Sequence, residues 1–210
     1  MKAKKTLSLF IASAIALTTG SGIAISATNT NVQAKQVTLS KGTYKVSAKG
    51  KITPGRYRIE SVQGHGVVSS IRKKPAGFFS ELIGDAAARN DSSTYISSYT
   101  TDLGKGNKLE FTGTGTYKLI KLSRKRHYRT TLTAGQWKVG RDIKPGKYTF
   151  TAITGQGNVA TDSYGSKYFF TQLLGTEKKA SSGRVTKFTK TLVKGEYLST
   201  GVEKIKLTRK

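Results

Sequence analysis

The sequence predicts an all-β protein of two tandem β-sandwich or jelly-roll-like modules that follow an N-terminal signal peptide. The first observation is a long-range repeat. The stretch 38–46 returns 93 positions later as 131–139, and Pro54-Gly55 returns 91 positions later as Pro145-Gly146. The second observation is a series of short runs rich in β-branched and aromatic residues, separated by glycine turns at regular spacing. This pattern is typical of sandwiches and barrels.

Most positions that recur are glycine, proline, aromatic or aliphatic residues. Gly64, Phe79 and Leu82, for example, return as Gly155, Phe170 and Leu173. Charged and hydroxyl positions change more freely between the copies. Because the recurring residue types set turns and cores, the duplicated feature is a fold and only weakly a reactive site.

The first 34 residues are typical of an export signal. A basic start precedes an apolar run from Leu7 to Leu17, followed by small residues. The run is shorter than the ~20 residues that a membrane span requires, so we expect no transmembrane anchor in the mature chain. Two small-residue cleavage sites end at Ala27 and Ala34, and cleavage after Ala34 is favoured because the repeat begins just downstream.

The chain contains no cysteine, which excludes disulfides, thiol catalysis and cysteine metal sites. The formal net charge is +26. Such an excess predicts attraction to polyanions and says nothing about the fold. Export without disulfides is ordinary in bacteria with a single membrane.

The repeat divides the chain into a first module at 35–123, a basic linker at 124–130 and a second module at 131–210. The linker is polar and lacks apolar periodicity. We therefore expect two separate bodies joined by a short tether. Strands are expected at 44–46, 57–59, 67–71, 95–99, 109–111 and 117–122 of the first module, and at 137–139, 148–152, 159–161, 185–188, 197–198 and 205–207 of the second.

A short helix is expected over 78–88, where Phe78, Phe79 and Leu82 have helical spacing. The equivalent segment 169–180 is expected to form a helix or, almost equally, a strand.

Turn residues have mechanical roles. Pro54-Gly55 and Pro145-Gly146 suit type II turns, because proline presets φ and glycine accepts a positive φ. The glycine pairs around His65 and Gln156 are expected to form tight hairpins, since strand-like residues follow them where a phosphate-binding loop needs a helix.

Few residues are suited to catalysis. His65 does not recur in the second copy, and His127 lies in the linker. Among the acids only Asp142, Glu196 and Glu203 are well placed, and a turn-stabilising role is favoured for Asp142. We therefore expect no enzyme and no cofactor or metal.

Recurring aromatics could stack on sugars or bases. Tyr44 and Tyr57 recur as Trp137 and Tyr148. Core residues also recur in this way, and a core role is favoured over an exposed stacking surface. No RNA-binding motif is present, so no specific nucleic-acid partner is expected.

Basic clusters are the strongest charged features. The residues proposed to bind polyanions are Arg124, Lys125, Arg126, Arg129, Arg72, Lys73 and Lys74. The alternative is a solvated linker for the first group and a solvated loop for the second.

The turn written Lys51-Ile52-Thr53-Pro54-Gly55-Arg56-Tyr57 and Asp142-Ile143-Lys144-Pro145-Gly146-Lys147-Tyr148 resembles an uncharacterised module of secreted and cell-surface proteins of Gram-positive bacteria. The resemblance covers nearly all of 37–208. It implies an extracellular place and a β architecture but no activity.

Together these features predict an exported, non-catalytic protein that binds anionic envelope polymers, such as teichoic-acid-like chains, through distributed lysine and arginine. It would be secreted and held at the cell surface non-covalently. The alternatives are a cationic antimicrobial or toxin-like protein and, less favoured, an envelope hydrolase.

Overall fold

The structure is a computed structural model that describes residues 36–71, 78–91, 94–162 and 166–210. The predicted signal peptide, 1–34, lies outside the described residues. Residues 34–210 form one compact unit. Most of the described chain is β-strand, which confirms the all-β prediction.

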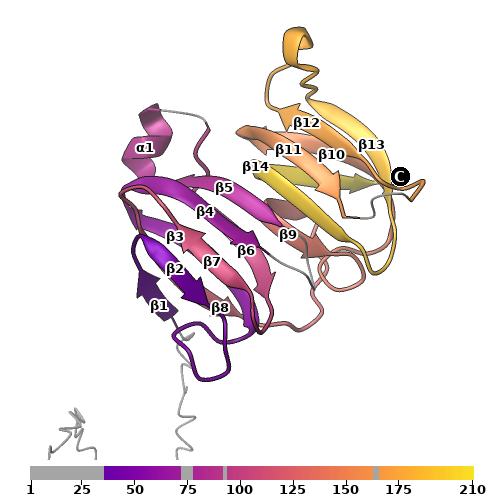
Figure 1. Ribbon diagram of the computed structural model, residues 1–210. Helices are drawn as coiled ribbons and strands as arrows, with labels where there is room; N and C mark the ends of the chain where they lie inside the picture. The colour runs from indigo at the N-terminus through magenta and orange to yellow at the C-terminus, as the bar shows by residue number, and fades with distance from the viewer. Residues whose placement is uncertain (1–35, 72–77, 92–93, 163–165) are drawn as a thin grey trace, which may run out of the picture. The chain divides into compact units, whose positions relative to one another are not determined.

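The elements follow the two copies of the repeat (Figure 1). Those of the first copy are β1 (Gln36–Leu39), β2 (Gly42–Lys45), β3 (Gly55–Gln63), β4 (His65–Ile71), β5 (Phe79–Gly84), α1 (Ala86–Asp91), β6 (Ser98–Leu103), β7 (Lys108–Phe111) and β8 (Thr116–Leu122). Those of the second are β9 (Thr131–Lys138), β10 (Gly146–Thr154), β11 (Gln156–Thr161), β12 (Thr171–Gly175), the 3₁₀ turn η1 (Ala180–Ser182), β13 (Lys187–Leu192) and β14 (Tyr197–Arg209).

The strands of both copies pair in the same order. In the first copy the order is β1-β8-β3-β6 in one sheet and β2-β7-β4-β5 in the other. In the second copy β9-β14-β10-β13 matches the first of these, and β14-β11-β12 matches part of the second. The long strands β9 and β14 each occupy the positions of two strands of the first copy. Strand β14 has a register shift between Thr200 and Lys204.

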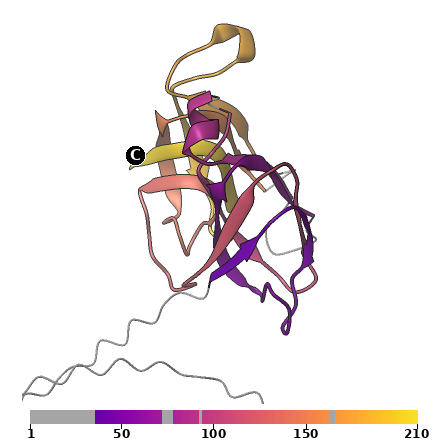
Figure 2. The same ribbon diagram turned by 90° about the vertical axis from the view of Figure 1, so that its left-hand side faces the viewer.

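The two copies are joined directly, which corrects the prediction of separate bodies on a tether. Strand β6 pairs with β9 in parallel at Thr100 and Gly135, so one ten-stranded sheet runs through both copies (Figures 1 and 2). The backbone N–H groups of His127 and Arg129 donate to the carbonyls of Arg141 and Asp142, at 2.9 and 2.8 Å. The segment 124–130 is therefore held against the second copy, and the pairing covers two strand edges that would otherwise be open.

Each copy supplies most of one cluster of buried apolar side chains. Repeated positions occupy matching places in the two clusters. Ile52, Tyr57 and Phe79 lie in the first, and their equivalents Ile143, Tyr148 and Phe170 lie in the second. The sequence repeat is thus a repeat of core positions.

The predicted hairpins at His65 and Gln156 are wrong. Strand β3 pairs with β6 and β8, whereas β4 pairs with β5 and β7, so the strands on either side of Gly64 do not pair with each other. Strands β10 and β11 are likewise unpaired with each other across Gly155. Both glycines have a positive φ, +69° at Gly64 and +79° at Gly155, and turn the chain through a corner.

The helix expected over 78–88 is also wrong for most of its length. Phe79–Gly84 is strand β5, and only Ala86–Asp91 is helical. The equivalent segment of the second copy contains β12, the alternative considered for it. Here sheet pairing with β4 and β11 decides the conformation over the local helical spacing.

The Pro-Gly pairs do not form the predicted type II turns. Gly55 has no positive φ, and Gly146 has a φ of +150°, far from the ~+80° of that turn. Each glycine is instead the first residue of a strand. A Cβ at Gly55 would lie 2.8 Å from Cε of Lys121, and one at Gly146 would lie 3.2 Å from Nε of Arg209. The neighbouring basic side chains are flexible and can give way, so space alone does not require glycine, whereas at Gly146 the φ of +150° is one that residues with a Cβ rarely adopt.

Four recurring aromatics share one contact. Each donates its side-chain hydrogen to the backbone carbonyl four residues earlier: Tyr44 to Ser40 at 3.0 Å, Trp137 to Thr133 at 2.9 Å, Tyr57 to Thr53 at 2.8 Å and Tyr148 to Lys144 at 2.7 Å. Trp137, Tyr57 and Tyr148 are buried, which confirms the core explanation for them. We infer that the aromatics recur because each holds the chain in place through this contact to the backbone.

We expect Tyr57→Phe and Tyr148→Phe each to lower the free energy of unfolding by about 1 kcal/mol, because each leaves a carbonyl without its hydroxyl partner. The measurement is urea denaturation. Tyr168→Phe, which removes a hydroxyl from an exposed ring, is the control and should change stability by less than about 0.5 kcal/mol. Equal effects for all three variants would contradict the assigned role.

Candidate functional site

Four charged side chains from the two copies meet at the joint between them. Arg56 of β3 lies 3.4 Å from Asp102 of β6 and 3.3 Å from Asp142. Arg141 lies 2.9 Å from Asp102 and 2.6 Å from Asp142. We call these four residues the joint charge cluster. Each arginine contacts both carboxylates, so the cluster ties the copies together.

Uncharged groups complete the joint charge cluster. The hydroxyl of Tyr197 in β14 donates to Asp102 at 3.1 Å. The guanidinium of Arg56 donates to the backbone carbonyl of Gln136 at 3.3 Å and lies 4.9 Å from the centre of the Trp137 ring. These contacts matter because buried ions need hydrogen bonds as well as counterions.

Electrostatics within the joint charge cluster favour the charged forms of Asp102 and Arg141. Burial alone would raise the pKa of Asp102, but the hydrogen bond from Arg141 and the charge of Arg56 outweigh it and hold that pKa below its usual value. Burial lowers the pKa of Arg56, and the charges of Asp142 and Asp102 offset part of this effect. Burial also disfavours the charge on Arg141, yet hydrogen bonds to both carboxylates raise its pKa overall.

Sequence reasoning reached only one member of this cluster. Asp142 was predicted to stabilise its turn, and it does accept a hydrogen bond from the backbone N–H of Lys138 at 2.8 Å. Its second role, the ion pair with Arg56, was missed. The aspartate and the arginines of the cluster do not recur between the copies, and this difference was a signal in the sequence. No pattern in the sequence, however, indicates that these side chains face one another.

A pocket of about 620 Å³ opens beside the joint, and we call it the basic pocket. Its cationic lining side chains are Arg56, Arg58, Lys125, Arg126 and Arg129, joined by His127 and the single acid Asp142. The buried Trp137 also lines it, and the guanidinium of Arg129 lies 5.8 Å from the centre of that ring. Cations of β3 and of the segment 124–130 therefore share one concave surface.

The predicted polyanion-binding residues divide three ways. Lys125, Arg126 and Arg129 line the basic pocket. Arg124 instead approaches the buried Asp102, with 3.8 Å between its Nε and the nearer carboxylate oxygen. The triplet Arg72, Lys73 and Lys74 lies outside the described residues.

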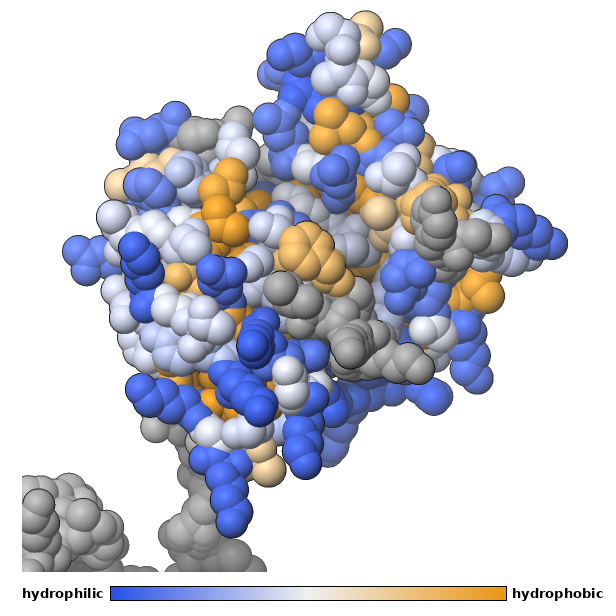
Figure 3. All heavy atoms as spheres, viewed as in Figure 1, coloured by the Kyte–Doolittle hydropathy of each residue, from blue (hydrophilic) through white to orange (hydrophobic). Residues whose placement is uncertain are grey.

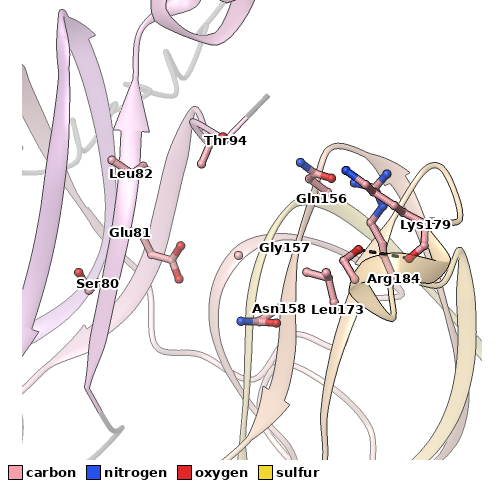
Figure 4. Close-up of a pocket in the computed structure, with 12 residues that line it drawn as sticks. Ser80, Glu81, Leu82, Thr94, Gln156, Gly157, Asn158, Leu173, Lys179 and Arg184 are labelled. Carbon is pink, nitrogen blue, oxygen red and sulfur yellow. Dashed lines mark hydrogen bonds between the residues drawn. The ribbon is translucent and has the colours of Figure 1, made fainter. Parts of the chain in front are cut away.

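A second pocket, of about 500 Å³, lies between β5 and the strands β11 and β12 (Figure 4). We call it the Glu81 pocket. Glu81 points into it from one wall, while Lys179 and Arg184 lie on the opposite wall. Burial raises the pKa of Glu81 to about 7. Sequence reasoning missed this acid, because nothing local to β5 indicates that β11 faces it.

The remaining candidate acids have structural roles. Glu196 accepts a hydrogen bond from the backbone N–H of Val193 at 2.7 Å, and Glu203 accepts one from that of Ser97 at 2.8 Å. His65 packs against the Tyr95 ring at 5.0 Å between centres. Across residues 36–71, 78–91, 94–162 and 166–210, no three of the His, Asp and Glu side chains gather as metal ligands would.

None of the helices in the described part of the chain has the length and apolar character to cross a bilayer. Comparison with family models, curated proteins and solved structures finds no match to this chain.

We expect Asp102→Asn to lower the free energy of unfolding by ~3–5 kcal/mol, because it leaves the buried guanidinium group of Arg56 and the half-buried one of Arg141 with one carboxylate. Urea denaturation at neutral pH measures this loss. Glu60→Gln, which breaks the more exposed ion pair with Arg58, is the control and should cost less than about 1 kcal/mol. Since Asp102 has a depressed pKa, its contribution should also vanish as the pH falls below the usual carboxyl range. A small loss in Asp102→Asn would contradict the importance of the cluster.

The raised pKa of Glu81 predicts that its contribution to stability depends on pH in the opposite direction to that of Asp102. The folded state holds the proton more tightly than the unfolded chain, so this residue's contribution to stability is complete below pH ~4.5 and declines until about pH 7. In Glu81→Gln that decline should be absent, and the variant should be more stable than the parent at pH 8. Denaturation at pH 5 and pH 8 measures it, and identical pH profiles for the two proteins would refute the assignment.

Proposed function

We propose that this is an exported, non-catalytic protein of two tandem β-sandwich modules, and that it holds phosphate-bearing polymers of the cell envelope through its lysine and arginine side chains. The observation that carries the proposal is the basic pocket, where five lysine and arginine side chains line one concavity with a single acid. Two layers of strands around one apolar cluster in the first copy support the sandwich architecture.

The chemistry of the basic pocket favours phosphate over neutral sugar. Guanidinium groups pair with phosphate oxygens through paired, charge-assisted hydrogen bonds. Lys125 and Arg126 form no ion pair with a described residue, so their charges are available to a ligand. A concave surface lined by one sign of charge also concentrates counterions.

The wider surface supports a polymer as ligand. Hydrophilic residues cover much of the face seen in Figure 3, and the chain carries a formal net charge of +26. A small anion would need only the pocket, whereas a polymer would contact the pocket and the cationic surface around it. We assign the pocket as the centre of binding and the distributed charge as its extension.

The export signal and the resemblance to secreted modules of Gram-positive bacteria support an extracellular place. The polymer at that place would be teichoic-acid-like, and attachment would be non-covalent.

We expect residues 35–210 to bind cell walls and to lose that binding when the phosphate polymer is extracted from them. A wash with about 1 M salt should release the protein, because it shortens the electrostatic reach to ~3 Å. Sedimentation with walls before and after extraction measures both effects. Retention on extracted walls would exclude the phosphate polymer, while leakage of liposomes or clearing of a wall zymogram would support an antimicrobial protein or a hydrolase instead.

The pocket itself is tested by charge removal. We expect the triple change Lys125→Gln, Arg126→Gln and Arg129→Gln to weaken binding of poly(glycerol phosphate) by at least about tenfold, because it removes charges that converge. The matched control, Lys147→Gln, Lys187→Gln and Lys206→Gln, removes three exposed charges of the second copy and should weaken binding far less. Isothermal titration calorimetry measures both. Equal losses would show that charge alone, and no pocket, governs binding.

A further inference from the structure

The Glu81 pocket is chemically unlike the basic pocket. Its volume of about 500 Å³ is within the ~300–1,000 Å³ of small-molecule sites. Its lining carries one carboxylate, two cations, amides and hydroxyls, with Leu82 and Leu173 as apolar members. Strand β5 forms one wall, and β11, β12 and the loop after β12 form the other (Figure 4).

The carboxylate of Glu81 lacks a counterion in the part of the chain that the structure describes. It forms no ion pair there, and burial is the sole cause of its raised pKa. It lies beside Gly201 of β14, where an added Cβ would be 3.1 Å from a Glu81 carboxylate oxygen. Glu81 is half-buried, so a ligand can reach its carboxylate, and a partly desolvated carboxylate without a cation is costly unless a ligand supplies the cation.

The opposite wall carries two cations on a backbone turn that is held by hydrogen bonds. Lys179 and Arg184 exchange backbone hydrogen bonds, each of 3.1 Å, across a tight turn closed by Gly183 at a φ of +67°. The Nε of Arg184 donates to the carbonyl of Glu177 at 2.8 Å. This contact orients the guanidinium group, whose terminal nitrogens form no hydrogen bond with a described side chain.

We propose that the Glu81 pocket binds a small zwitterion, a short peptide with free ends, whose ammonium group pairs with Glu81 and whose carboxylate pairs with Lys179 and Arg184. Charges of opposite sign on facing walls select a ligand that carries both signs. A polyanion would be repelled by Glu81, and a simple cation would be repelled by Lys179 and Arg184. The amides of Gln156 and Asn158 lie on the same wall as Lys179 and Arg184 and can bond the peptide group.

This inference is independent of the proposed function, because it concerns another pocket and another ligand chemistry. It also carries a pH dependence. The groups in the pocket that titrate or bear charge are Glu81 on β5 and Lys179 and Arg184 after β12, while the pocket residues of β11 and β14 are uncharged. The ammonium pairs only with the ionised carboxylate, and a peptide α-amino group, with a pKa of about 7.7–8.0, is still partly charged at pH 8. Binding should therefore be tighter at pH 8 than at pH 5.5, where Glu81 is mostly protonated.

The test uses residues 35–210 and the dipeptide Ala-Ala, with binding followed by isothermal titration calorimetry or by NMR chemical shifts. Two analogues report on the ends separately: the N-acetyl dipeptide lacks the ammonium group, and the dipeptide amide lacks the carboxylate. We expect Ala-Ala to bind at pH 8 and each analogue to bind at least about tenfold more weakly.

Glu81→Gln should weaken Ala-Ala binding at least about tenfold and remove its pH dependence, and Arg184→Gln should weaken it without removing that dependence. Glu110→Gln, which removes an exposed acid from the same four-stranded sheet, is the matched control and should bind as the parent does. Absence of Ala-Ala binding at pH 8, or equal binding by the parent and Glu81→Gln, would overturn the proposal. So would equal binding of Ala-Ala and its N-acetyl analogue.

Discussion

The joint charge cluster, in which two arginines and two aspartates form ion pairs, is the interaction on which the arrangement of the two copies depends. Edge pairing between β6 and β9 brings Arg56, Asp102, Arg141 and Asp142 together. The pairing itself rests on one register position, Thr100 opposite Gly135, and each ion must also meet its partners to offset the cost of its burial. The hydrogen bonds and ion pairs among these side chains therefore favour this arrangement of the copies.

Both pockets are consequences of that meeting. The basic pocket takes Arg56 and Arg58 from one copy and Trp137 and Asp142 from the other. The Glu81 pocket takes its carboxylate from one copy and its cations from the other. Duplication of a β framework thus produced concave surfaces that neither copy contains alone, and this explains why the candidate residues do not recur between copies.

The β class, the repeat and most strands could be predicted from the sequence, because glycine, proline and alternating apolar residues report on local geometry. The core residues Ile52 and Tyr57 were recognisable through their copies Ile143 and Tyr148. Strand β5 was mistaken for a helix because its apolar spacing suits either conformation, and only pairing with β4 decides. Part of the basic pocket was predicted from its run of charged residues. Glu81 and the joint charge cluster were not, since long-range pairing creates their surroundings and no local pattern encodes it.

The direct contact between β6 and β9 also limits how such a chain can evolve. A half released at residues 124–130 would carry an open strand edge and would lose the ion pairs of Arg56 with Asp142 and of Arg141 with Asp102, a combination that favours aggregation. Recombination among genes can therefore move the two copies together far more readily than one at a time. The two copies together are therefore the unit that evolution can transfer or duplicate.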